Sequence, residues 1–230
     1  MTMTVSVVIP VYNGAQYLAE ALDSVVAQTV SPQRIILVDD GSSDDSRTIA
    51  QRCPQVQLIE TSHQGVADAR NTGIEASDTT LIAFLDQDDI WLPQKLEKQL
   101  ALFDANPSPE YVLALQSYFL EPGINRPAWL KADILQGPQE GSTPSALVVR
   151  KSLFSRIGYF DPRYPNASDV DWFFRAKDMG IPHQTVEELL VRKRVHADNQ
   201  SERVMAIHRE ILQISRASIM RQKRKQRGAQ

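Results

Sequence analysis

The chain has 230 residues, of which 42% are hydrophobic and 23% are charged, and its formal net charge is -3. This size suits one large α/β domain with its own core, and the charge does not indicate a nucleic-acid partner. The single cysteine excludes an intrachain disulfide and a zinc site built on cysteines. Because the first apolar run lacks a basic start and contains Pro10, we expect no signal peptide and a cytoplasmic protein. No run approaches the ~18 apolar residues of a membrane span.

Strands and helices alternate in the first part of the chain. Short runs rich in Val and Ile are typical of buried strands, and we expect strands over 5–12, 34–40, 56–60 and 80–86. Helical spacing and helix-start signals after these runs predict helices over 15–28, 41–53, 65–77 and 93–106. This alternation predicts a doubly wound, mostly parallel sheet of the α/β class, with helices on both faces.

The second half of the chain is less regular. We expect a strand over 111–120 and then a long loop over 121–144 that is rich in Pro and Gly and holds one helical turn. Further strands are expected over 145–150 and 188–196, and helices over 151–158 and 168–180. From 199 to about 227 the pattern is helical and becomes basic.

Acidic residues end two of the predicted parallel strands. Asp39 and Asp40 follow the second strand, and Asp86, Asp88 and Asp89 follow the fourth. Because ligands of open α/β sheets bind at the carboxyl ends of the strands, we expect both groups at one binding edge. In an extended D-x-D pair the two carboxylates share a side, and such oxygens suit Mg²⁺ or Mn²⁺. The alternatives are a D-x-D pair in a plain surface turn and an Asp40 that only caps the next helix.

The common glycine-based phosphate sites are absent from the sequence. There is no G-x-x-x-x-G-K-[ST] motif, and the segment VYNGAQY after the first strand is not G-x-G-x-x-G. The acids after the predicted strands therefore suggest that a phosphate is held through a metal ion and not in a glycine cradle.

Four motifs together resemble one enzyme family. In order and spacing, VSVVIPVYNGAQYLAEALDSVVAQT, ILVDDGSSDDS, ADARNTGIEAS and FLDQDDIW resemble the nucleotide-binding half of family 2 glycosyltransferases, which have the GT-A fold. The resemblance is dense from Val5 to about Leu102 and looser, through SDVDWFFR and RVHADNQS, to about Ser201. It implies a nucleotide-sugar-binding half over 1–105, an acceptor-binding and catalytic-base half over 106–200, and a C-terminal helix with a basic tail over 201–230.

The resemblance assigns the nucleotide to the first half. Pro10, Val11 and Tyr12 would line the base pocket. Asp40 matches the acid that accepts the N3–H of the base, which favours uracil or thymine, and Arg70 matches a residue near the base and the diphosphate.

The resemblance places the metal at the D-x-D pair. Asp88 would be the direct ligand of Mn²⁺ or Mg²⁺, and Asp86 would lie near the ribose or the water shell of the metal. Arg194 and His196 resemble a late segment that touches the diphosphate or the metal, with His196 as a further metal ligand.

Asp169 resembles the second acid of a Glu-Asp pair, which is the general base of the family. Ser168 stands where the family has the first acid, and this departure leaves Asp171 as a rival base unless Asp171 faces solvent. Trp129, in the long loop, is a candidate platform for an acceptor sugar.

These roles imply an inverting, metal-dependent glycosyltransferase of the hexosyltransferase type. It would move a sugar from a nucleotide-diphosphate donor to a hydroxyl acceptor in glycan, polysaccharide or glycolipid synthesis. The acid at Asp40 favours a UDP-sugar as this donor. A nucleotidyltransferase is one alternative, although the segment after the first strand lacks its Gly-rich basic signature. A catalytically inactive nucleotide-sugar binder is the other, because Ser168 replaces an acid.

The basic tail suggests a second kind of partner. It carries Arg221, Lys223, Arg224, Lys225 and Arg227, which either form a solvated end or attract an anionic membrane surface. A lipid-linked acceptor and a peripheral position at the inner membrane face would fit the second reading. The sequence indicates no oligomeric state.

Overall fold

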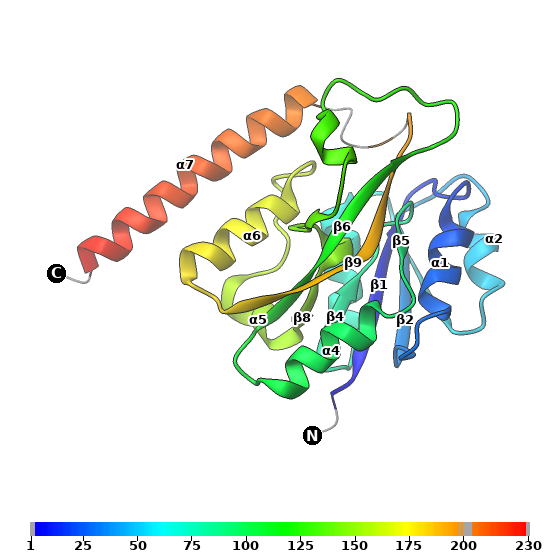
Figure 1. The fold of residues 1–230 in the computed structure, drawn as a ribbon, viewed down its shortest axis with the longest axis horizontal. Coiled ribbons are helices and arrows are strands. Elements are labelled where there is room, and N and C mark those ends of the chain that lie inside the picture. Colours follow the sequence, from blue (N-terminus) through cyan, green and yellow to red (C-terminus); the bar gives the residue numbers. More distant parts are fainter. Residues whose placement is uncertain (1–2, 198, 200–203, 229–230) are drawn as a thin grey trace.

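The computed structural model describes residues 3–197, 199 and 204–228, and these residues contain one mixed sheet of nine strands (Figure 1). The strand order is β3-β2-β1-β4-β8-β6-β9-β5, and β7 pairs with β6 outside this path. The strands are β1 (Val5–Val11), β2 (Arg34–Asp39), β3 (Val56–Glu60), β4 (Leu81–Phe84), β5 (Ile90–Trp91), β6 (Tyr111–Leu120), β7 (Gln139–Glu140), β8 (Val148–Arg150) and β9 (His183–Val195).

The parallel part of the sheet comes from the first part of the chain, as its alternation predicts. β1 lies between β2 and β4, with Val7 opposite Ile35 on one side and Ala83 on the other. β8 then runs antiparallel between β4 and β6, and β9 lies parallel to β6 although residues 121–182 separate the two strands. The pair Ile90–Trp91 escapes prediction because two residues show no periodicity.

The described residues form seven helices, of which the first six pack on the sheet and the seventh packs on the sixth. They are α1 (Leu18–Val26), α2 (Ser46–Gln51), α3 (Val66–Ala76), α4 (Lys95–Ala105), α5 (Lys151–Ile157), α6 (Ser168–Met179) and α7 (Val204–Gly228). Two 3₁₀ turns lie between β6 and β8: Ala132–Leu135 is the helical turn expected in the loop, and Pro144–Ala146 takes the place of the first residues of the strand predicted over 145–150. α1 begins three residues later than predicted, because Tyr17 and Leu18 both donate to the Gly14 carbonyl in a preceding turn. Residues 200–203, in the predicted C-terminal helical segment, lie outside the described residues.

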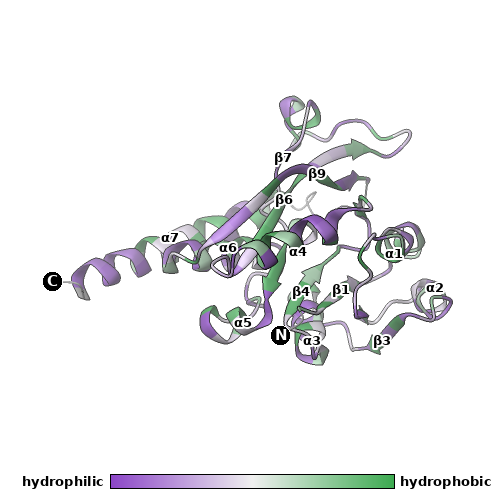
Figure 2. Ribbon diagram, turned by 60° about the horizontal axis from the view of Figure 1, so that its bottom comes forward, coloured by the Kyte–Doolittle hydropathy of each residue, from purple (hydrophilic) through white to green (hydrophobic). Residues whose placement is uncertain are grey.

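Helices cover both faces of the sheet, because alternate residues of each strand point to opposite sides. On β1, Val7 and Ile9 pack in the core that contains α1 and α4, whereas Val8 packs in the core that contains α3, α5 and α6. The strands in the middle of the sheet are accordingly hydrophobic along most of their length (Figure 2). Among the described residues, no helix is both long enough and apolar enough to cross a membrane.

Gly73 sets how closely α3 approaches β1. A Cβ atom on Gly73 would lie 2.3 Å from Cγ1 of Val8, which is completely buried. We expect Gly73→Ala to lower the free energy of unfolding by about 1–3 kcal/mol, because the added methyl overpacks this contact. Urea denaturation measures the loss. The Val8→Ala/Gly73→Ala double variant should lose less than the sum of the single losses, and Glu75→Ala on the exposed face of α3 should stay within about 0.5 kcal/mol.

Candidate functional site

The predicted acidic edge forms where β1, β2 and β4 end. β4 ends at Phe84, and a turn in which the Asp89 N–H donates to the Asp86 carbonyl (3.1 Å) follows it. Gln87, a residue that the motifs did not single out, joins this turn to β1: its side chain accepts from the Tyr12 N–H (2.8 Å) and donates to the Tyr12 carbonyl (3.2 Å). The acidic turn and the end of β1 are therefore fixed to each other.

Arg70 reaches the acidic turn from α3. Its Nη2 atom lies 2.7 Å from Oδ1 of Asp86, and its side chain is almost completely buried. Burial would raise the pKa of Asp86, but the charges of Arg70 and Lys193 outweigh it and hold that pKa below its usual range. Arg70 thus forms an ion pair with Asp86, one of the predicted nucleotide-binding acids, and its nearness to the nucleotide stays a prediction.

Lys193, on β9, is the residue of this cluster that the sequence analysis missed. Its ammonium pairs with Asp89 and lies 3.6 Å from Asp86. Burial, with the charges of Asp88 and Asp86, raises the pKa of Asp89 to about 7 although Lys193 opposes the shift. Burial would lower the pKa of Lys193, and the surrounding carboxylates raise it instead. Alternation along β9 could have predicted that Lys193 points inward, because Val191 and Val195, two residues to either side of it, both face the core.

We expect Lys193→Met to lower the free energy of unfolding by about 3 kcal/mol, because it leaves the buried Asp89 without its cation, while Asp86 keeps only Arg70. Urea denaturation near neutral pH measures this loss. Adding Asp89→Asn should restore part of the stability by removing one negative charge. Lys98→Met breaks an exposed pair with Glu188 (3.0 Å) and serves as the matched control, with an expected loss below about 1 kcal/mol. Equal losses in the two single variants would contradict a buried role for Lys193.

The structure brings the two predicted metal ligands together. Nε2 of His196 lies 3.0 Å from Oδ2 of Asp88, and Nδ2 of Asn199 lies 3.2 Å from the same oxygen. The described part of the chain contains no group of three or more His, Cys, Asp or Glu side chains that could hold a metal ion. A carboxylate oxygen beside an imidazole nitrogen fits Mn²⁺ or Mg²⁺ only if the ion takes its other ligands from a diphosphate and water.

Arg194 is fully engaged by protein groups. Its guanidinium pairs with Glu121 (2.5 Å) and with Glu20, and its Nε donates to the Asp88 carbonyl (3.1 Å). Burial would lower the pKa of Arg194, and its bonds to these two carboxylates raise it instead. Arg194 thereby connects β9, α1 and the loop that follows β6, and its contact with the diphosphate or the metal stays a prediction.

The residues predicted to form the base pocket lie where β1 and β2 end. Val11 buries its side chain in the core, and Pro10 is buried in β1. Of the three residues, Tyr12 is the exposed one, with 44% of its surface accessible. The Asp40 N–H donates to the Val11 carbonyl (2.7 Å), which places the buried Asp40 carboxylate beside the end of β1.

The Asp40 carboxylate also organises the loop between β3 and α3. Its oxygens accept from the N–H groups of Gln64 (2.9 Å) and Gly65 (2.7 Å) and from the Thr61 hydroxyl (3.1 Å). The Nδ1 atom of His63 lies 3.2 Å from its Oδ2. Asp40 therefore has a structural role, but a different one from the cap that the sequence left open: it holds the residues that lead into α3 and does not cap α2, the next helix.

The predicted base begins α6. Asp169 is half-buried in the first turn, beside the buried Ser168, and burial together with the charge of Asp86 raises its pKa although Arg70 opposes the shift. A carboxylate with a raised pKa takes a proton more readily. The rival Asp171 does not face solvent: it is 4% exposed and pairs with Arg175 (2.7 Å), which also donates to the Tyr159 carbonyl (2.7 Å). Asp171 thus holds α6 to the preceding loop.

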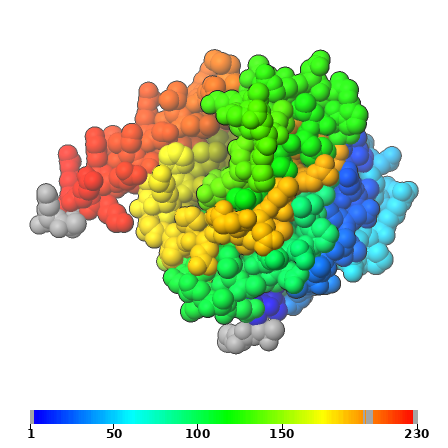
Figure 3. All heavy atoms as spheres, viewed as in Figure 1, coloured from blue at the N-terminus to red at the C-terminus, as the bar shows by residue number. Residues whose placement is uncertain are grey.

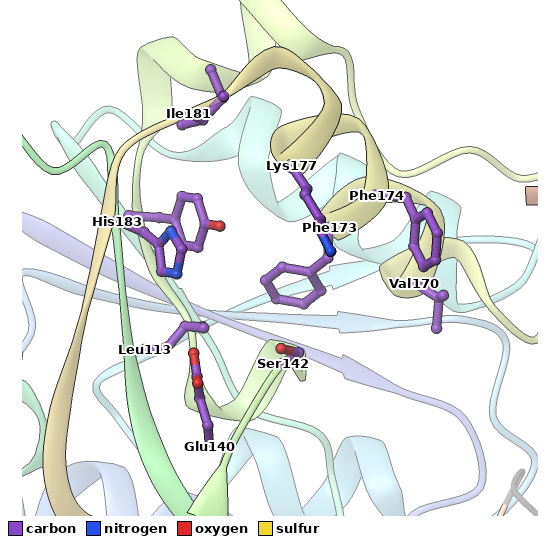
Figure 4. A pocket seen from close by; sticks show the side chains of 11 residues that line it. Leu113, Glu140, Ser142, Val170, Phe173, Phe174, Lys177, Ile181 and His183 are labelled. Atoms are coloured by element: carbon purple, nitrogen blue, oxygen red, sulfur yellow. The ribbon is translucent and has the colours of Figure 1, made fainter. Parts of the chain in front are cut away.

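A cavity of about 590 Å³ lies between α6, β6 and β9 (Figure 4). Val170, directly after Asp169, lines it, and Phe173 from α6 and Leu113 from β6 point into it. The acidic turn is not part of its lining. Trp129 is half-buried in the loop between β6 and β8 and is not among the lining residues either.

The sequence of this chain is similar to those of known glycosyltransferases. A family model described as glycosyl transferase family 2 matches residues 6–176. An uncharacterized glycosyltransferase of Rickettsia prowazekii (strain Madrid E) is 32% identical over 209 residues, which are 84% of this chain and 64% of that protein. Chondroitin synthase of Escherichia coli is 26% identical over 218 residues, which are 90% of this chain and 31% of that protein. The chain thus spans somewhat less than two thirds of the rickettsial relative.

Solved structures of S. aureus TarS share the fold. TarS 1–349 in complex with UDP-GlcNAc matches with a TM-score of 0.73 and 19% identity, covering 95% of this chain and 67% of that one. The complex with UDP matches with a TM-score of 0.67 and 22% identity, covering 91% and 66%. This likeness confirms the predicted GT-A fold. Because the family model covers most of the chain, this chain belongs to glycosyl transferase family 2.

Proposed function

We propose that this chain is an inverting, metal-dependent glycosyltransferase that uses a UDP-sugar donor. One observation carries the proposal: Tyr12 with Asp40, Asp88 with His196, and Asp169 come from distant parts of the sequence and gather around one acidic turn. These groups supply the requirements of the reaction in order, namely a base site, a site for the charged diphosphate and a proton acceptor.

The residues divide the work as follows. Tyr12 offers a face for the base, and Asp40 accepts its N3–H. Asp88 and His196 would hold Mn²⁺ or Mg²⁺, which when bound neutralises the charge on the leaving diphosphate. Arg70 holds Asp86 at the rim of the site. Asp169 takes the proton from the acceptor hydroxyl, and attack opposite to the leaving group inverts the anomeric centre.

We further propose that residues 106–200 supply the acceptor contacts, since α6 carries both Asp169 and one wall of the cavity. The acceptor is a carbohydrate or a lipid-linked glycan, and the transferred unit is a hexose or a related sugar. The buried Ser168 stands where the family has an acid, so an inactive nucleotide-sugar binder is the competing function. A measurement of turnover separates the active enzyme from the inactive binder.

Titration calorimetry tests the donor site directly. UDP, GDP, dTDP and CDP are titrated into the protein with and without Mn²⁺, and sugar conjugates of the nucleotide that binds are then screened for turnover. We expect UDP to bind most tightly and to require the metal, and release of UDP from a UDP-sugar to follow. Binding without turnover on any acceptor would favour the inactive binder, and no nucleotide binding would contradict the proposal.

We also propose that α7 rests on an anionic membrane surface. α7 packs on α6 through Ser218 and Arg221, which both bond to Asp178 (2.7 Å each), and its C-terminal part stands clear of the body (Figure 3).

The large exposed apolar side chains of α7 are Met205, Leu212, Ile219 and Met220. Its one acid, Glu210, is bound by Asn166 (2.6 Å), whereas seven residues of the helix are basic: Arg209, Arg216, Arg221, Lys223, Arg224, Lys225 and Arg227. Exposed apolar side chains and a surplus of basic ones supply the two attractions that bind a helix to an anionic membrane surface.

We expect the protein to sediment with vesicles that contain phosphatidylglycerol and not with vesicles of phosphatidylcholine alone. Replacing the four basic residues of 223–227 by Gln should weaken this binding at least about tenfold at low salt, because each cation near an anionic surface contributes about 1 kcal/mol. Arg163→Gln, which removes an exposed cation elsewhere, should leave it unchanged. Equal binding by the wild type and the tail variant would contradict the membrane role.

A further inference from the structure

His63 makes two contacts at the proposed base site. It lies in the loop between β3 and α3, and its imidazole stacks on the Tyr12 ring with 4.0 Å between centroids and 26° between planes. Its Nδ1 atom is 3.2 Å from Oδ2 of the Asp40 carboxylate and also 3.2 Å from the main-chain carbonyl oxygen of Asp40. A flat ring thus covers Tyr12 and presents a nitrogen to Asp40.

The same two contacts belong to the nucleotide base in the proposed function, on which this inference rests. A uracil ring would stack on Tyr12 and donate its N3–H to Asp40. Both rings need the same face of Tyr12 and the same carboxylate, so they compete. We propose that His63 occupies the base site of the nucleotide-free protein and must turn away before a donor binds, so that His63 sets the affinity of the site for nucleotides.

The surroundings allow the ring to turn while the pocket stays in place. The side chain of His63 is 57% exposed, so one face of the ring is open to solvent. The backbone on its C-terminal side is held separately, because the N–H groups of Gln64 and Gly65 donate to Asp40. Asp40 therefore keeps its position and its backbone donors when the imidazole leaves. Its carboxylate is then already placed to accept the N3–H of the base.

Competition of this kind has a specific consequence. The apparent dissociation constant of every nucleotide is raised by the same factor, namely the inverse of the fraction of molecules in which His63 is turned away. A stacked ring and one hydrogen bond correspond to a factor between about 5 and about 30. Removing the ring should therefore tighten the binding of UDP and dTDP equally and leave the preference between them unchanged.

Calorimetry with UDP and Mn²⁺ on His63→Ala tests the proposal. The variant should bind UDP between about 5-fold and about 30-fold more tightly than the wild type. His183→Ala is the matched control, because His183 also stacks on a tyrosine, Tyr111, at 4.8 Å and 3°, but lines the cavity under α6. It should leave the affinity unchanged. Unchanged or weaker UDP binding in His63→Ala would overturn the proposal while leaving the donor site intact, whereas absence of binding in all proteins would overturn the donor site as well.

Labelling of histidines gives a second measurement on the wild type. Diethylpyrocarbonate modifies exposed imidazoles, and mass spectrometry reports each site separately. UDP with Mn²⁺ should speed the labelling of His63, because the base releases the ring from Tyr12, and should not change the labelling of the exposed His208. Protection of His63 by UDP would show that the ring closes over the base, and this result would overturn the proposal.

Discussion

Replacing Asp88 by Asn should lower kcat/KM by about 100-fold to 1,000-fold, because the variant loses the carboxylate that would hold the cation beside the diphosphate. Asp88 bonds to His196 (3.0 Å) and Asn199 (3.2 Å) through one oxygen, and an amide of the same shape can keep this frame. The measurement is the initial rate of UDP release as a function of UDP-sugar and Mn²⁺ concentration.

The variant should also lose the stimulation of UDP binding by Mn²⁺ in calorimetry. Asp104→Asn, at an exposed position of α4, is the control and should behave as the wild type. A rate that stays within a few-fold of the wild type and still rises with Mn²⁺ would exclude Asp88 as the metal ligand.

Asp169→Asn should lower kcat by about 100-fold to 10,000-fold, because the variant lacks the group that takes the acceptor proton. UDP binding should be unchanged, since the predicted base contacts the acceptor and not the nucleotide. The combination of calorimetry with turnover therefore separates a loss of chemistry from a loss of the site.

Asp171→Asn is the informative comparison for Asp169. The Asp171 carboxylate is buried and pairs with Arg175, so this variant should lose stability in urea denaturation while the folded enzyme keeps most of its kcat. The opposite result, with kcat lost in Asp171→Asn and kept in Asp169→Asn, would move the role of base to Asp171.

The pH dependence of kcat gives a further check on Asp169. Burial raises the pKa of Asp169, and only its ionised form accepts a proton. Activity should therefore fall as the pH falls through this raised pKa, at a higher pH than an ordinary aspartate would give. The Asp169→Asn variant should lack this acidic limb in its residual activity.

The local parts of the fold could be read from the sequence. The predicted strands over 56–60 and 111–120 agree with β3 and β6 residue for residue, because their patterns and flanking signals are contained in a few neighbouring residues. The two-residue β5 and β7 were missed, because they owe their conformation to pairing with β9 and β6. The antiparallel direction of β8 also depends on partners that no local pattern names.

The candidate site also has a part that the sequence predicts and a part that depends on tertiary contacts. Asp40, Asp86, Asp88, Asp169 and His196 stand in ordered motifs, from which the sequence by itself predicted the family that the model over residues 6–176 shows, and their individual roles stay predictions. Only the tertiary structure decided their partners, because an ion pair depends on side chains that meet across β9, α3 and the end of β4. Lys193 among the carboxylates, Arg194 between two glutamates and His63 on Tyr12 are pairings across more than 50 residues of chain, where no periodicity in the sequence constrains contact.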